Sequence, residues 1–551
     1  MNIGCFEFFK RAKFALAGLA LIISDFAACA AFAANLPDTK PQDLTFSRLA
    51  VRRFEFSQNI PLCELNPSET VSLKPMYPAF AESGNSKPKP AALYPAKIEG
   101  GLLVFNRLKQ PQASICVGGV NPYATYELDV ESLEEGADIG LEFARLGLGS
   151  RIQVLAAKEG GKVGFSLRVL EGGKALKEEK FEGAFAGESF KLYVQLYGRS
   201  LGLFADFGGG VRYVGHTPQK EPFSENLDFR NRKIAADSSF NIVSNLKGKA
   251  ALKSAKSYLS SGVGQADIRM VTNSDSSPYF KDGRLWFTFS ARGLDIAQSA
   301  QGVMSFNPSV FDLRFEGLVV FDHGDGLLRN DYASHLMFDG KKNLWRAITC
   351  DFGGSKNTEE RTGSGLVLAE SAHCPLQGFS VMKAQRLEGF DCRNEDPCLF
   401  YDEGAKKWRL LTSAFMNKDI VARMYESDSI GGPYRAIAGP IRENSTGTVI
   451  QKIGGGVYVL TGGKENMRVH SYPNLDYVCD VNFKLQPHWP APAGRVWANI
   501  VPLPAGFPYR YVLMTMDRPN FPNVKGPNWS YGALHFYGAY TPEISGEACE
   551  F

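Results

Sequence analysis

Residues 398–411, CLFYDEGAKKWRLL, place an apolar run, a polar turn with a glycine and a second apolar run next to one another. The pattern recurs in residues 278–289, PYFKDGRLWFTF, and 336–348, LMFDGKKNLWRAI, and more loosely in residues 449–460 and 500–513. The five turn glycines follow one another at intervals of 57, 64, 50 and 52 residues: Gly283, Gly340, Gly404, Gly454 and Gly506. Such intervals are typical of the four-stranded blades of a β-propeller. The repeat therefore predicts a five-bladed β-propeller over residues 265–551, and a second sandwich with coincidental hairpins is the alternative.

The composition of the whole chain favours strands. Its 551 residues are 44% hydrophobic, 22% charged and 12% aromatic, which excludes a disordered chain, a coiled coil and a collagen-like repeat. With 56 Gly, 39 Phe and 21 Tyr, the chain has many turns between aromatic-rich strands. The 61 basic residues nearly balance the 58 acidic ones, so bulk charge gives no reason to expect a nucleic-acid partner. The expected class is all-β.

A different pattern occupies residues 43–246. Short alternating runs are separated by glycine-rich turns, as in a β-sandwich. Residues 190–197 and 201–207 resemble the paired strands of a concanavalin or laminin-G-like jelly roll. We therefore expect a sandwich over residues 43–246, and a linker or short helix over residues 247–264, which are rich in Ala, Ser, Lys and Gly.

The first 33 residues have the layout of a secretory signal peptide. Lys10, Arg11 and Lys13 precede an apolar run over residues 14–23, and the stretch ends in Ala-Phe-Ala at residues 31–33. The run is shorter than the roughly 20 residues that a membrane span needs. We expect cleavage after Ala33 and export to the periplasm or the extracellular space, with a membrane anchor or a lipoprotein at Cys29 as alternatives.

Removal of that segment leaves eight cysteines, an even number that favours disulfides in an exported chain. Eight cysteines allow many pairings, and proximity in the sequence suggests Cys63 with Cys116, Cys350 with Cys374, Cys392 with Cys398, and Cys479 with Cys549. A zinc site is the rival interpretation, although no CxxC pair occurs.

Acidic residues recur at one register of the repeat. Asp275 lies eight positions before Gly283, and Asp396 lies eight positions before Gly404. In the second copy, Asp331 lies nine positions before its turn glycine, and His335 lies five before it. Because the innermost strands of a propeller start at one mouth of the channel, these side chains are predicted to converge there. Converging carboxylates suit glycoside hydrolysis, whereas an Asx turn capped by each Asp is the alternative.

These residues also resemble a known family. Residues 394–402, NEDPCLFYD, followed by Lys407 and Trp408, are similar to the third-blade motif of glycoside hydrolase family 43 and its relatives in families 32 and 68. Residues 275–283 resemble the first-blade motif, and residues 425–434 resemble an outer-strand segment; together the match covers roughly residues 267–543. The resemblance implies that Asp275 is the general base or nucleophile and that Asp396 stabilises the transition state and tunes the acid.

The general acid departs from the family pattern, which places a Glu at the start of the fourth blade. Thr446-Gly-Thr448 occupies that place, and Glu443, the nearest acid, lies eleven positions before Gly454. Asp331, Glu395 and His335 are the other candidates for the acid, since histidine can deliver a proton near neutral pH. His335 could equally be an ordinary buried histidine.

Substrate contacts are expected from the fifth blade. Trp497 could stack on a sugar ring, with Arg495 or Arg518 on an acidic substituent and Asn499 and Glu395 as further polar contacts. Motifs of serine hydrolases, P-loop enzymes and zinc proteases are absent from the sequence.

The sequence thus predicts an exported glycoside hydrolase acting on a poly- or oligosaccharide. A non-catalytic carbohydrate-binding propeller and a glycan phosphorylase on the same fold are the alternatives. The resemblance makes calcium possible without requiring it, and no other cofactor is expected. No stretch beyond residue 33 is long and apolar enough to span a membrane.

Overall fold

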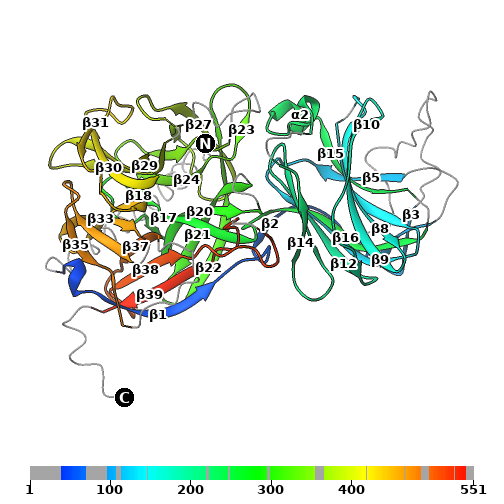
Figure 1. The fold of residues 1–551 in the computed structure, drawn as a ribbon, viewed down its shortest axis with the longest axis horizontal. Helices are drawn as coiled ribbons and strands as arrows, with labels where there is room; N and C mark the ends of the chain where they lie inside the picture. Colours follow the sequence, from blue (N-terminus) through cyan, green and yellow to red (C-terminus); the bar gives the residue numbers. More distant parts are fainter. Residues whose placement is uncertain are drawn as a thin grey trace, which may run out of the picture.

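The computed structural model describes residues 39–69, 96–106, 113–145, 147–218, 223–245, 248–294, 298–353, 365–391, 393–416, 418–463, 466–484, 496–525 and 528–540. Within these ranges the regular structure is almost entirely strand, and the helices are short: η1 (Pro41–Asp43), η2 (Glu225–Leu227) and α2 (Arg232–Ala236). The all-β class is confirmed. Figure 1 shows a propeller on the left and a sandwich on the right.

The propeller consists of five four-stranded blades, whose strands follow one another from the channel outward. Blade 1 comprises β17 (Gly264–Met270), β20 (Arg284–Arg292), β21 (Ser299–Asn307) and β22 (Asp312–Asp322). Blade 2 comprises β24 (Tyr332–Asp339), β25 (Leu344–Cys350), β26 (Leu366–Ser371) and β27 (Gly378–Arg386). Blade 3 comprises β28 (Asn394–Asp402), β29 (Lys407–Met416), β30 (Asp419–Ser427) and β31 (Arg435–Ala438). Blade 4 comprises β32 (Thr446–Ile453), β33 (Gly456–Gly462), β34 (Met467–Ser471) and β35 (Tyr477–Asp480). Blade 5 comprises β37 (Val496–Pro502), β38 (Tyr511–Met516), β39 (Leu534–Ala539) and β1 (Thr45–Arg52).

The blades form a closed ring around the channel. Their innermost strands contact one another in the cyclic order β17, β24, β28, β32 and β37. The outermost strands of blades 1 and 2, β22 and β27, also pair with each other in parallel. Four two-residue strands complete the propeller: β18 (Thr272–Asn273), β19 (Phe280–Lys281), β23 (Leu328–Arg329) and β36 (Asn482–Phe483). The predicted five-bladed propeller is confirmed.

The outer strand of blade 5 comes from the other end of the described chain. Strand β1 pairs antiparallel with β39, from Ser47 opposite Gly538 to Arg52 opposite Leu534, and the two ribbons lie side by side in Figure 1. The expectation that residues 43 onward belong to the sandwich is therefore wrong for β1. Pairing the two ends of a propeller covers an edge that would otherwise be open, so the strand has a physical reason to cross over.

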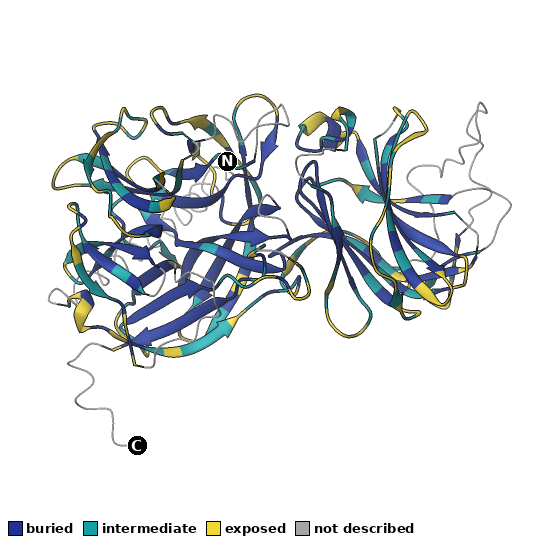
Figure 2. Ribbon diagram, in the orientation of Figure 1, coloured by how far each residue is buried: buried dark blue, intermediate teal, exposed yellow. Residues whose placement is uncertain are grey.

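The sandwich has two sheets. One has the order β10-β9-β8-β7-β15-β5 with β11 beside β9, and the other has the order β14-β13-β12-β6-β16-β4-β3 with β2 beside β16. The strands of the first sheet are β5 (Ala113–Gly119), β7 (Asp138–Arg145), β8 (Ser150–Glu159), β9 (Lys162–Glu171), β10 (Lys174–Lys180), β11 (Phe185–Ala186) and β15 (Ser238–Ser244). Those of the second are β2 (Asn59–Leu65), β3 (Ala96–Glu99), β4 (Leu102–Phe105), β6 (Thr125–Leu133), β12 (Phe190–Leu196), β13 (Leu201–Asp206), β14 (Arg212–His216) and β16 (Ala250–Ser260). Their facing side chains form one apolar core, and much of these strands is coloured as buried in Figure 2.

The segment expected to be a linker is a strand instead. β16 lies inside the second sheet, with β6 on one side and β4 and β2 on the other. Its small Ala and Ser side chains suit a strand buried between neighbours, although their composition resembles a linker. The sandwich thus extends to Ser260.

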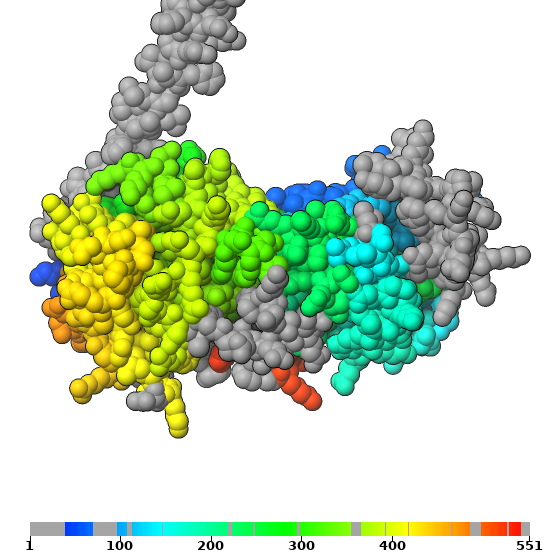
Figure 3. All heavy atoms as spheres, turned by 90° about the horizontal axis from the view of Figure 1, so that it is seen from above, coloured from blue at the N-terminus to red at the C-terminus, as the bar shows by residue number. Residues whose placement is uncertain are grey.

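The sandwich and the propeller touch through specific contacts. The hydroxyl of Tyr123 donates to the carbonyl of Leu328 at 2.7 Å, and Arg230 Nη1 donates to the carbonyl of Gly353 at 3.0 Å. Apolar packing adds Phe204 against Phe521, with ring centroids 5.6 Å apart. Seen from above, the green segments that end the sandwich and begin the propeller run continuously between the two lobes (Figure 3).

The predicted disulfides do not form within the described residues. Cys63, Cys116, Cys350, Cys374, Cys398 and Cys479 are all free thiols there. Cys350 and Cys398 are buried inside the propeller, whereas Cys374 is exposed, so two of the proposed partners have different environments. Cys392, Cys549 and the predicted signal peptide lie outside the described residues. No described helix is long and apolar enough to cross a membrane.

Candidate active site

Each innermost strand carries the same irregularity close to its first residue. The pairing with the second strand skips two residues, and the first skipped residue has a positive φ angle of 52° to 63°. The five residues, in blade order, are Asp267, Ala333, Asp396, Gly447 and Trp497. Such a bulge re-aims a side chain without breaking the sheet. The bulges thus define one equivalent position per blade.

These positions meet at one mouth of the channel. A Cβ atom added to Gly447 of blade 4 would lie 2.7 Å from the backbone nitrogen of Trp497 in blade 5. The backbone N–H of Gly447 also donates to Asp396 Oδ2 of blade 3 at 3.0 Å. Asp396 in turn interacts electrostatically with Asp267 of blade 1. Two of the five positions therefore bring carboxylates to the same mouth.

Asp396 is held firmly and is nearly enclosed, with 6% of its surface exposed. Its Oδ2 accepts hydrogen bonds from Thr446 Oγ1 and from the Gly447 N–H, both at 3.0 Å. Within the described residues no hydrogen bond reaches Oδ1. Burial and the negative charge of Asp267 raise the pKa of Asp396 above the ordinary aspartate value. The proximity of Asp267 thus disfavours the charged form of Asp396.

Cationic and thiol groups surround this pair. Arg269, which is 1% exposed, donates to the carbonyl oxygens of Thr448 at 2.6 Å and of Asp396 at 3.1 Å, and its guanidinium lies 4.6 Å from the Trp497 ring centroid. Arg518, half-buried after β38, lies close enough to Asp396 to lower its pKa in part. Cys350 lies beside Asp396, Glu395 and Asp267; burial and these carboxylates raise the pKa of its thiol.

Asp275 is not at this mouth, contrary to the prediction. It follows β18, which lies alongside the last residues of β24 at the opposite end of the channel. Its carboxylate accepts from Ser277 N and Oγ at 3.0 and 2.6 Å and pairs with Lys452 at 2.9 Å. Burial opposes the effect, but these contacts lower the pKa of Asp275. It caps a turn, which was the alternative interpretation.

Asp275 was predicted at the mouth because blade 1 has a longer segment between its innermost strand and its hairpin turn than blade 3 has. Gly283 follows Asp267 by sixteen positions, whereas Gly404 follows Asp396 by eight, because a short strand and a loop are inserted in blade 1 before its hairpin turn. Counting back from the turn glycine therefore reached the wrong aspartate. Asp267, Arg269 and Cys350 are residues of the mouth that the turn register did not predict. A count forward from the start of each inner strand could have found Asp267.

The side chains of His335 and Asp331 are already engaged in hydrogen bonds within the protein. His335 is 1% exposed; its Nδ1 accepts from Leu399 N at 3.1 Å, so its Nε2 carries the proton and donates to Thr272 Oγ1 at 2.9 Å. Asp331 is fully buried, with Oδ1 bonded to Gly353 N and Oδ2 to His323. Neither group is free to protonate a substrate, so both are removed from the candidates for the acid.

The blade 4 position holds no acid for a steric reason. Gly447 has a φ of +63°, and a side chain there would collide with the Trp497 backbone and ring. Glu443 lies nearby in sequence, but its side chain is 65% exposed and pairs with Arg468. Glu443 is therefore not available as the general acid of this mouth.

The predicted substrate contacts divide into buried and accessible residues. Trp497 and Asn499 are both 0% exposed, and Asn499 bonds to the backbone of Met270 and Ile268, so neither can be a sugar platform. Arg518 and Glu395 lie at the mouth and are half-buried. Arg495 lies outside the described residues.

The environment of His335 has a consequence for stability. Burial, together with the charge of Arg269, lowers the pKa of its imidazole well below 6.5. The unfolded chain binds a proton that the folded state does not, so this contribution to stability is lost as the pH falls below about 6.5. We expect the free energy of unfolding to drop between pH 7.5 and pH 5, and to drop less in His335→Gln. Denaturant titrations at both pH values measure this difference; an equal drop in the two proteins would contradict it.

At the sequence level, no family model and no curated protein matches the chain. Among solved structures, a family 117 glycoside hydrolase of Zobellia galactanivorans matches at 10% identity and a TM-score of 0.35, covering 52% of this chain and 99% of that one. A family 43 enzyme of Xanthomonas citri matches at 12% identity and 0.35, covering 50% and 87%. A galectin of Caenorhabditis elegans matches at 14% identity and 0.19, covering 28% and 94%. At these identities the likeness concerns the fold alone.

Proposed function

We propose that the chain is a glycoside hydrolase whose reacting groups are Asp267 and Asp396. The observation that carries the proposal is the placement of two electrostatically coupled carboxylates, from blades 1 and 3, at equivalent bulges of one channel mouth. Hydrolysis of a glycosidic bond needs a carboxylic acid to protonate the leaving oxygen and a carboxylate to activate water or attack the anomeric carbon. A raised pKa in one of two neighbouring carboxyl groups suits that division.

The two roles follow from the surroundings. We assign Asp396, whose pKa is raised by burial and by Asp267, as the proton donor. Since Oδ2 already accepts two hydrogen bonds, the proton belongs on Oδ1 and is donated from there. Asp267 is more exposed and acts as the base or nucleophile. Arg518 is placed to contact an acidic or hydroxyl group of the sugar.

The substrate class, a poly- or oligosaccharide, and export to the periplasm or beyond belong to the same proposal. The test is a screen of the purified protein on aryl glycosides and polysaccharides. Release of reducing sugar by the wild type, absent in Asp396→Asn, supports the proposal. Saturable glycan binding without any release would instead support a non-catalytic binding propeller, which the missing blade 4 acid favours.

The pH profile tests the coupling directly. Because Asp267 helps to raise the pKa of Asp396, Asp267→Asn should lower that pKa. The form with protonated Asp396 is active, so activity declines as the pH rises through its pKa. We expect the alkaline limb of the residual activity of Asp267→Asn to lie at lower pH than in the wild type. An alkaline limb at the same pH in both proteins would mean that Asp267 does not raise the pKa of Asp396.

A further inference from the structure

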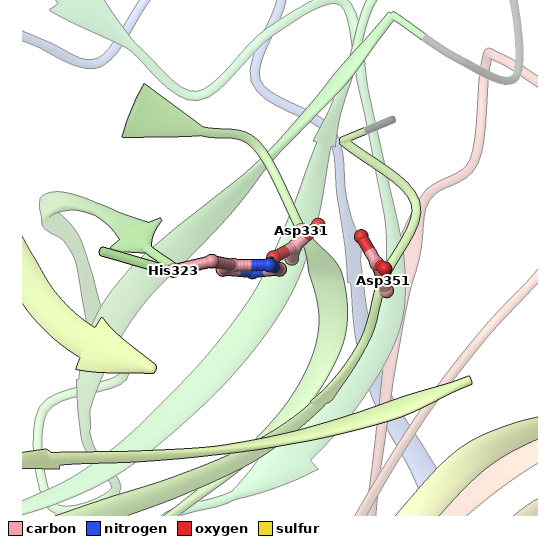
Figure 4. Close-up of side chains that lie close together, drawn as sticks. All are labelled: His323, Asp331 and Asp351. Carbon is pink, nitrogen blue, oxygen red and sulfur yellow. The ribbon is translucent and has the colours of Figure 1, made fainter. Parts of the chain in front are cut away.

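A second cluster of metal-binding side chain types lies on the mouth face, between blades 1 and 2. His323 follows β22, Asp331 precedes β24 and Asp351 follows β25. One donor atom from each of the three lies within 4.8 Å of the others, and Figure 4 shows the Asp351 carboxylate directed at Asp331 and the imidazole. Asp331 is fully buried, whereas His323 and Asp351 are half-buried. The cluster is thus anchored at its base and open on one side.

The arrangement is pre-organised. The Gly353 N–H donates to Asp331 Oδ1 at 2.8 Å and fixes the carboxylate, while Asp331 Oδ2 lies 2.9 Å from His323 Nε2. A Cβ atom at residue 353 would lie 2.9 Å from Asp331 Oδ1, so only glycine allows this approach. Two ligand atoms bound at about 2.1 Å and at right angles around one metal ion lie about 3 Å apart. The 2.9 Å between Asp331 Oδ2 and His323 Nε2, now a hydrogen bond, therefore suits two neighbouring ligands of one ion once Nε2 gives up its proton.

The triad itself holds two carboxylates and one imidazole, and the charges of Arg329 and Arg386 act on Asp351 from outside it. Arg329, whose charge acts on Asp351, is already paired with both carboxylate oxygens of Asp325 at 2.8 and 2.6 Å. Within the described residues, no hydrogen bond donor reaches the Asp351 carboxylate. Two carboxylates that share a partly buried space repel each other, and a metal ion bound between them would relieve that repulsion.

We propose that His323, Asp331 and Asp351 bind one divalent first-row transition metal ion, which joins blade 1 to blade 2 beside the mouth. The mixed donor set selects the class of ion: an imidazole with two carboxylates suits Zn²⁺ or Mn²⁺, whereas Ca²⁺ and Mg²⁺ prefer oxygen ligands alone. The open side leaves room for water to complete the coordination. The site stands independently of the proposed hydrolase function, because no ligand is shared with Asp267 or Asp396.

The test uses tag-free, full-length protein freed of metal with EDTA, titrated with Zn²⁺ and, separately, with Mn²⁺ in a calorimeter. We expect one ion per chain, and a loss of affinity of more than about tenfold in His323→Gln and Asp351→Asn. Asp312→Asn removes a carboxylate that pairs with Arg284 and Arg314 at the opposite end of β22, away from the triad, and should bind like the wild type. The side chains of His323 and Asp351 are partly exposed, so we expect both variants to fold. The test therefore needs no variant of the buried Asp331.

A spectroscopic readout identifies the ligand. Mn²⁺ bound to the wild type should show the pulsed-EPR modulation of a directly coordinated imidazole nitrogen, and His323→Gln should not. Ca²⁺ should bind the wild type no more tightly than it binds His323→Gln. Absence of a one-to-one site, or equal Zn²⁺ affinity in the wild type and His323→Gln, would overturn the proposal.

Discussion

Asp267→Asn is expected to lower kcat/KM by about 1,000-fold on any glycan that the wild type cleaves, because it removes the base or nucleophile. Steady-state kinetics on the glycan identified by the screen measure the loss. Asp275→Asn is the matched control: it makes the same chemical change at the opposite end of the channel. Its side chain is 44% exposed and pairs with Lys452 at the surface, so activity should stay within twofold of the wild type.

The choice of leaving group separates the roles of the two mouth carboxylates. The 2,4-dinitrophenolate group of a 2,4-dinitrophenyl glycoside departs without protonation. Asp396→Asn should therefore lose activity on the natural glycan and keep most of its activity on this aryl glycoside. Asp267→Asn should lose activity on both. An equal loss of activity on both substrates in Asp396→Asn would contradict the role of Asp396 as proton donor. Full activity of Asp267→Asn beside an inactive Asp275→Asn would restore the assignment made from the turn register.

Local signals explain which parts of this structure could be predicted. Each hairpin of the propeller carries its own glycine turn and flanking apolar runs, so five blades could be read from residues that lie close together in sequence. Asp396 lies at the start of such a hairpin and was placed correctly in its strand. Asp267 was missed because the inserted segment in blade 1 changes its distance from Gly283.

Contacts between distant segments explain the rest. The absence of an acid in blade 4 depends on the approach of Gly447 to Trp497, which lies in another blade. The prediction assigned β1 to the sandwich for the same reason, since its partner β39 lies almost at the other end of the chain. Backbone pairing at a sheet edge needs no particular side chains, so neither strand marks its partner in the sequence.

The pairing of β1 with β39 makes the stability of the propeller sensitive to substitution of Phe46. Phe46 of β1 is 1% exposed and packs in the core of blades 4 and 5, with its ring centroid 6.3 Å from that of Phe483. In the sandwich, where residues 43 onward were expected, this ring would contribute nothing to the propeller. In the observed position, Phe46→Ala removes a buried aromatic ring at the closing strand. We expect it to lower the free energy of unfolding of the propeller by about 3–5 kcal/mol.

Tryptophan fluorescence can follow this effect in the propeller alone, because every tryptophan lies beyond the sandwich: Trp286, Trp345, Trp408, Trp489, Trp497 and Trp529. Phe415→Ala makes the same substitution at a side chain that is 45% exposed in blade 3, and should cost less than about 1 kcal/mol. Denaturant titrations of both variants give the comparison. A shift for Phe46→Ala no larger than that for Phe415→Ala would mean that β1 does not complete blade 5 in solution. A large shift would place the two ends of the described chain in one blade, and would explain why the propeller needs residues on both sides of the sandwich.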